Sequence, residues 1–173
     1  NSCFYDSIEG HLNKKKYRIR WYGKTFTENN QKIKNSNFEI KIKRDNLNYK
    51  KTFHLGEFLL PKKILFPDLL LTTTNLLKRN VDELEYLYIE NFEPFFINSY
   101  FREYYIDLSG DIRLTIDRKQ KFYNARPMIF NHVTSDEIII ELKFKSKISF
   151  NNFVIKSNLA QNSKFTNGIN IFV

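Results

Sequence analysis

The stretch KYRIRWY, residues 16–22, decides the fold, because charged and apolar side chains alternate along it. Successive side chains of a β-strand point to opposite faces of the sheet, so Arg18 and Arg20 share one face and Ile19 lies on the other. The stretch therefore predicts a strand with one apolar face and one cationic face. A single strand of this kind is not specific, because charged side chains usually lie in water.

The same alternation recurs in later segments of the chain. FEIKIKR at residues 38–44, YFREYY at 100–105, RLTID at 113–117 and IIELKFK at 139–145 all place charged residues on a strand face. These charged residues are Glu39, Lys41, Lys43, Arg102, Arg113, Asp117, Glu141 and Lys143. Repetition on strand after strand describes a barrel with a charged lumen, and a lumen rich in lysine and arginine suits a polyanion.

Strands dominate the predicted secondary structure. Six are predicted where residues rich in isoleucine, phenylalanine and tyrosine alternate with polar ones, at 17–22, 37–44, 49–54, 95–107, 111–117 and 137–145. Residues 67–92 instead predict one or two helices, with Asp68 and Asp82 as caps, and 149–159 predict another. Residues 27–37 are expected to form a hairpin loop, and Asn167 with Gly168 a turn.

Composition limits the classes of partner. The chain has 173 residues, which predicts one domain, and its formal net charge of +9 favours an anionic partner. That partner could be a nucleic acid, a membrane surface or a soluble phosphate compound. One cysteine, Cys3, excludes an internal disulfide and favours a cytoplasmic location. No apolar run approaches the roughly 20 residues of a membrane-spanning helix.

Seven segments occur in the order that is found in the VTC domain, the polyphosphate polymerase branch of the triphosphate tunnel metalloenzymes (CYTH-like superfamily). They are SCFYDS, KKKYRIRWYG, FEIKIKR, YFREYY, RLTID, IIELKFK and NSKFTNGI, between residues 2 and 169. The chain therefore resembles this family over nearly its whole length. The resemblance implies an α+β fold in one domain over residues 1–173, an antiparallel β-tunnel, closed or nearly closed, with flanking helices.

The family normally begins with a strand that carries a Glu-x-Lys pattern. This chain begins after that strand, at SCFYDS. The resemblance therefore predicts a tunnel domain that lacks the N-terminal part of the family fold.

The resemblance also implies an activity, the transfer of the terminal phosphoryl group of ATP to polyphosphate with Mn²⁺ or Mg²⁺. The residues that match the triphosphate-binding set are Arg18, Arg20, Lys41, Arg102, Arg113 and Lys164, with Lys43 and Lys143 as weaker matches. Glu39 and Asp117 would orient these cations through ion pairs. Glu141 stands where the family has its metal-ligating glutamate.

The chemistry of these residue types agrees with that activity. Phosphoryl transfer is accelerated mainly by positioning and by neutralising charge on phosphate oxygens, so no side-chain nucleophile is required. Arginine can hold phosphate oxygens through two hydrogen bonds, and lysine acts as a mobile point charge.

Other functions stay open. A triphosphate hydrolase of the same superfamily would use water as acceptor, and a noncatalytic module would only bind polyphosphate or triphosphate. A nucleic-acid-binding barrel is a fourth class, but no familiar RNA-binding motif is present, so nucleic acid is not an expected partner. The expected partners are ATP, polyphosphate and triphosphate, and an association with membrane proteins is left open.

Overall fold

The computed structural model describes residues 14–23, 31–44, 47–60, 66–125, 132–146 and 162–172. The chain divides into two compact units. The first comprises Asn1–Phe96 with Asn124–Asn131, and the second Ile97–Tyr123 with His132–Val173. No helix in the described ranges is long and apolar enough to cross a membrane.

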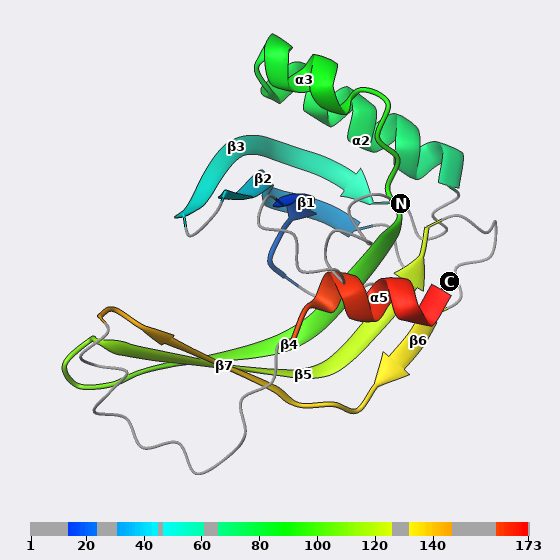
Figure 1. Ribbon diagram of the computed structural model, residues 1–173. Helices are drawn as coiled ribbons and strands as arrows, with labels where there is room; N and C mark the ends of the chain where they lie inside the picture. Colours follow the sequence, from blue (N-terminus) through cyan, green and yellow to red (C-terminus); the bar gives the residue numbers. More distant parts are fainter. Residues whose placement is uncertain are drawn as a thin grey trace. The chain divides into compact units, whose positions relative to one another are not determined.

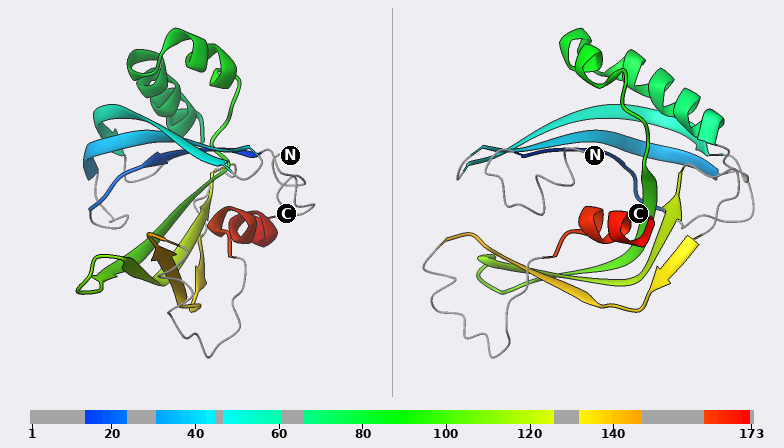
Figure 2. Two further views of the ribbon diagram at one scale, coloured as in Figure 1. Left: turned by 60° about the vertical axis from the view of Figure 1, so that its left-hand side comes forward. Right: turned by 45° about the vertical axis from the view of Figure 1, so that its right-hand side comes forward.

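The first unit contains a three-stranded antiparallel sheet with two helices on one face (Figures 1 and 2). Its strands, in sheet order, are β1 (Lys14–Arg20), β2 (Gln31–Arg44) and β3 (Leu47–Leu60). The covering helices are α2 (Phe66–Asn80) and α3 (Glu83–Ile89).

Strand periodicity decides which face the helices cover. Phe38, Ile40 and Leu55 point to the same side of the sheet and form a buried cluster with Val81 and Ile89 from the helical segment. The charged residues between them therefore lie on the other face. The predicted division into an apolar face under helices and a charged face is found in this sheet.

The second unit is built on a four-stranded sheet with one helix beside it (Figure 1). Its elements are β4 (Phe96–Ile106), β5 (Ile112–Asn124), β6 (His132–Ser135), β7 (Ile139–Phe144) and α5 (Lys164–Phe172). The first part of β5 pairs with β7 and its second part with β6. Lys119, which has a φ of 52°, lies between these two parts and marks the change of partner.

The predicted α+β class, with antiparallel strands and flanking helices, is confirmed. Each predicted strand overlaps an observed one, and residues 67–92 do contain two helices. The predicted capping is wrong, because α2 begins before Asp68, and Asp82, at the N-cap position of α3, makes no side-chain capping hydrogen bond to that helix. The described strands form two sheets, and no closed barrel is found among them. The single-domain interpretation and the missing N-terminal strand stay predictions.

The hairpin-loop prediction for residues 27–37 is wrong from Gln31 onward, because β2 begins there. The polar stretch contains a bulge, in which Asn35 has a φ of 54° and the Ser36 hydroxyl donates a hydrogen bond to the Gly56 carbonyl at 2.9 Å. A bulge tolerates residues that are typical of turns, and this composition hid the strand.

The predicted turn at Asn167 and Gly168 is also wrong, since both residues lie within α5. The helix starts at a capping residue, because the Ser163 hydroxyl accepts a hydrogen bond from the Thr166 N–H at 3.4 Å. Gly168 and Ile169 are buried, so packing outweighs the local turn preference of Asn-Gly. Strand β6 was not predicted, and the predicted helix at 149–159 lies outside the described residues.

Candidate functional site

The charged face of the β1–β2–β3 sheet is organised in rows that cross the three strands. In one row Lys16 lies opposite Lys41, which lies opposite Lys50. In the next row Arg18 lies opposite Glu39. Like charges in directly opposed positions destabilise a sheet unless negative charge lies nearby, and Glu39 in the next row supplies such a charge, 2.7 Å from Lys50.

Glu39 is the carboxylate around which this face is built. Its side chain is only 5% exposed, and Arg18 donates from Nε to Oε2 at 2.6 Å. Lys50 Nζ lies 2.7 Å from Oε1, and Arg20 Nη1 lies 3.8 Å from the same oxygen. Burial by itself would raise the pKa of Glu39, but the hydrogen bonds from Lys50 and Arg18 outweigh it and lower that pKa. Glu39 therefore stays ionised and holds three cations.

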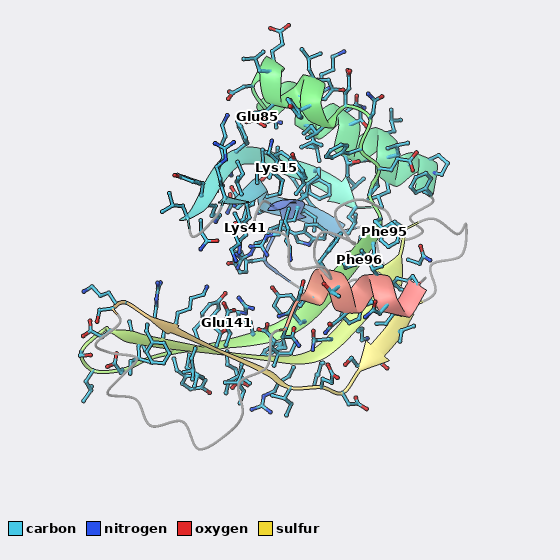
Figure 3. The ribbon with its side chains drawn as sticks, in the orientation of Figure 1. Lys15, Lys41, Glu85, Phe95, Phe96 and Glu141 are labelled. Carbon is cyan, nitrogen blue, oxygen red and sulfur yellow. The ribbon has the colours of Figure 1, made fainter. Side chains whose placement is uncertain are left out.

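The cations held at Glu39 are still accessible. The side chains of Arg18 and Lys50 are 42% and 48% exposed, so each can contact a ligand while one side of it is anchored. Lys41 and Lys43 are exposed on the same face. Figure 3 shows Lys41 on the side of the sheet away from α2 and α3.

Lys51 and Lys15 lie on the opposite face of this sheet and have a structural role. Lys51 Nζ lies 3.0 Å from Asp82 and 3.3 Å from Glu85, so it ties β3 to the start of α3. Lys15 lies over the Tyr88 ring, 4.9 Å from its centroid. Neither lysine belongs to the charged face.

The second unit has its own buried carboxylate, Asp117 on β5. Its side chain is 1% exposed, and Arg102 on β4 donates Nε to Oδ1 at 2.5 Å and Nη2 to Oδ2 at 2.6 Å. Lys164 at the start of α5 lies 2.5 Å from Oδ2. The Tyr100 ring contacts both cations, 5.1 Å from Arg102 and 4.8 Å from Lys164. A two-pronged guanidinium–carboxylate pair fixes the plane of Arg102.

These contacts also set the protonation of the pair. Burial by itself would raise the pKa of Asp117, but the hydrogen bonds from Arg102 and Lys164 outweigh it and hold that pKa below its ordinary value. The hydrogen bond to Asp117 raises the pKa of Arg102 in turn. The pair is therefore ionised at neutral pH.

A pH titration of stability tests this assignment. Because the folded-state pKa of Asp117 is lowered, its contribution to stability is fully present above its ordinary pKa of about 4 and is lost as pH falls through the lowered value. The free-energy difference between wild type and Asp117→Asn, from urea unfolding, should be largest near neutral pH and shrink below about pH 4. A difference that does not change with pH would show that the charge of Asp117 is not what matters.

Glu141 on β7 is a more accessible carboxylate. Its side chain is 44% exposed, with Lys143 Nζ at 3.3 Å and Arg102 Nη2 at 4.0 Å. Register places Arg113 directly opposite Lys143, on the same face of the sheet. Cations therefore surround Glu141.

The divalent metal that the resemblance implies can be tested against these donors. Within the described ranges no three His, Cys, Asp or Glu side chains gather into a metal-binding group. Both oxygens of Asp117 are committed to cations at short distance, whereas Glu141 is 44% exposed and its cations lie at 3.3 and 4.0 Å. Mg²⁺ commonly binds through one or two carboxylates together with phosphates and waters. Glu141 fits an ion of this kind, one that is shared with a phosphate ligand.

The structure gathers the predicted residues into two sets. Arg18, Arg20, Lys41 and Lys43 share the face of Glu39, and Arg102 and Lys164 meet at Asp117, with Arg113, Lys143 and Glu141 on neighbouring strand positions. The prediction that all of them line one tunnel stays a prediction.

Sequence reasoning missed Lys50. Lys50 and Lys51 are neighbours on β3 and point to opposite faces of the sheet. The signal was present in the sequence, because Lys51 shares its strand face with Tyr49 and Phe53, which leaves Lys50 on the polar face. Its position opposite Lys41 agrees with this assignment.

Comparison with known proteins identifies the family. A family model described as the VTC domain matches residues 1–173, the whole chain. A search of the curated proteins finds no match. The chain belongs to the VTC domain family.

Proposed function

We propose that this chain transfers the terminal phosphoryl group of ATP to a polyphosphate chain, with Mn²⁺ or Mg²⁺ as cofactor. Membership of the VTC domain family supports the substrate class. The observation that carries the proposal is that buried carboxylates fix the orientation of cations. Glu39 holds Arg18, which stays 42% exposed, and Asp117 holds the more buried Arg102.

Such anchored cations suit a phosphate ligand. An arginine whose side chain is already oriented loses less rotational freedom when it binds, so more of the interaction energy appears as affinity. Lys41 and Lys50 lie opposite each other, so an anion that contacts both also relieves their mutual repulsion. A polyanion with closely spaced charges would gain the most binding affinity from this arrangement, because it can contact several of these cations at once.

The reaction needs charge neutralisation more than acid–base chemistry. An oxygen of the terminal phosphate of the acceptor chain forms a bond to the γ-phosphorus of ATP, the bond from that phosphorus to the β–γ bridging oxygen breaks, and ADP leaves. The acceptor oxygen is already anionic at neutral pH, so no general base is required. Arginine and lysine side chains would bind the nonbridging oxygens and stabilise the charge that spreads over them.

Glu141 would hold the divalent ion. When bound, the ion would supply positive charge that offsets the negative charge of the phosphate groups. Glu141 would position it, while Lys143 and Arg113 would neutralise neighbouring phosphates. A cytoplasmic location, where ATP is abundant, fits this proposal and the single cysteine, Cys3.

Replacement of Glu141 with glutamine tests the activity. The Glu141→Gln variant should lose polyphosphate synthesis from ATP by about two orders of magnitude at limiting Mn²⁺, the scale on which one transition-state charge interaction acts. Binding of tripolyphosphate without metal should be retained, because the change removes a negative charge from a basic surface. Polyphosphate formed and tripolyphosphate affinity are the two measurements.

Glu103→Gln on β4 is the matched control, because Glu103 is paired with Arg118 instead of lying among the proposed site cations. Synthesis at the wild-type rate in the Glu141 variant would remove Glu141 from the mechanism. A wild-type chain that binds tripolyphosphate but makes no polymer would favour a noncatalytic module, and one that releases inorganic phosphate would favour a hydrolase.

A further inference from the structure

The outer face of α3 exposes large apolar side chains. Leu84, Leu87 and Tyr88 are 79%, 54% and 69% exposed, and their spacing of three and four residues places them on one side of the helix. Ile89, which is 2% exposed, anchors the other side in the core. We call Leu84, Leu87 and Tyr88 the α3 strip.

One edge of the α3 strip is acidic, although the chain as a whole is basic. At the other edge Lys15 lies over the Tyr88 ring, and Lys51 pairs with Asp82 and Glu85. Residues 82–93 contain no lysine, arginine or histidine, and their acids are Asp82, Glu83, Glu85, Glu90 and Glu93. Glu83 and Glu90 are both exposed and are seven residues apart, so they lie along the same edge of the strip. The chain carries a formal net charge of +9, so this acidic segment contrasts with the rest of the molecule.

The α3 strip is held in place. Lys51 on β3 contacts Asp82 and Glu85 at 3.0 and 3.3 Å, at the start of the helix. Val81 and Ile89 fix the two ends of the helical segment in the core of the first unit. A partner would therefore meet a preformed surface, which reduces the entropic cost of binding.

We propose that the α3 strip docks a basic amphipathic helix of a partner protein. Leucine and tyrosine would supply the apolar contacts at the centre of such an interface, and Glu83 and Glu90 would pair with lysine or arginine at its rim. The charge contrast gives the reason for a basic partner, because Glu83 and Glu90 line one edge of the strip while the chain as a whole carries a formal net charge of +9.

A designed peptide provides the probe. A labelled helix of about 18 residues, long enough to form a helix, carries leucine on one face and lysine on the other. Fluorescence anisotropy at physiological salt should show saturable binding to the wild-type chain. Leu84→Ser combined with Leu87→Ser should weaken it about tenfold or more, as expected for central contacts. Glu83→Lys should weaken it most at low salt.

Leu71→Ser is the matched control, because Leu71 is 63% exposed on α2 and lies outside the α3 strip. It should bind the peptide as wild type does. Unchanged thermal melting in all variants would show that folding is retained. The proposal is overturned if a scrambled peptide of the same composition binds equally well, or if the strip variants bind like wild type. Two other results would also overturn it. If the wild-type chain dimerises in sedimentation and the strip variants do not, the strip binds a second copy of the chain. If the wild-type chain binds neutral phospholipid vesicles and the strip variants do not, the strip binds a lipid surface.

Discussion

Replacing Asp117 with alanine is expected to reduce the free energy of unfolding by about 3 to 5 kcal/mol, the loss seen when one partner of a buried ion pair is removed. Arg102 and Lys164 are only 17% and 20% exposed, and without Asp117 they would repel each other at short range. Their hydrogen bonds to the carboxylate would be lost at the same time. The measurement is urea unfolding at neutral pH.

An exposed ion pair in the same unit provides the control for this variant. Asp111→Ala removes a carboxylate that is 42% exposed and lies 3.7 Å from Lys145. Exposed pairs contribute roughly 0 to 1 kcal/mol, so the loss should be small. If both variants unfolded at the same urea concentration, the buried carboxylate would not be an organising element of the fold. Added tripolyphosphate should restore part of the lost stability, because it binds the folded state.

Replacing Arg18 with alanine should weaken tripolyphosphate binding by about 1.5 to 3 kcal/mol, or roughly tenfold to 150-fold, the contribution of a charge-assisted hydrogen bond. Protein stability should change less, because Lys50 still pairs with Glu39. Calorimetric titration measures the affinity.

Lys15→Ala is the matched control for charge. Lys15 lies on the same strand as Arg18, but on the face that α3 covers, so both variants lose one positive charge. A general effect of net charge would weaken binding equally in the two variants. Equal affinities for Arg18→Ala and Lys15→Ala would therefore exclude Arg18 from the phosphate-binding face.

The alternation of charged and apolar residues along the strands predicted much of the fold and of the candidate site. Arg18, Arg20 and Glu39 were assigned to one face from alternation alone, and register confirms that they are neighbours. Alternation works here because the other face is buried under helices, so a shift by one residue would place charges in the core. Where one face of a strand is buried, the alternation in its sequence shows which residues point away from the core.

The features that the sequence did not predict depend on contacts between residues that are distant in the sequence. The contact of Lys50 with Glu39 depends on the pairing of β3 with β2, which places Lys50 opposite Lys41 in the row next to Glu39. The start of β2 and the helix at Gly168 were hidden by residues that locally favour turns. In both places tertiary packing selects a conformation that the local sequence does not favour.

The repeating rows on β1–β2–β3 bear on how a long ligand could travel. Positions two apart on a strand are about 6.7 Å apart, and successive rows contain Arg20, Arg18, Lys41 and Lys43. A bound polymer of identical anionic units that shifted by one row would again contact cations. Its binding free energies before and after the shift would therefore be similar. Registers of similar free energy would leave no single position of the polymer strongly preferred. A surface of this kind could therefore bind a homopolymer at many successive positions along its length.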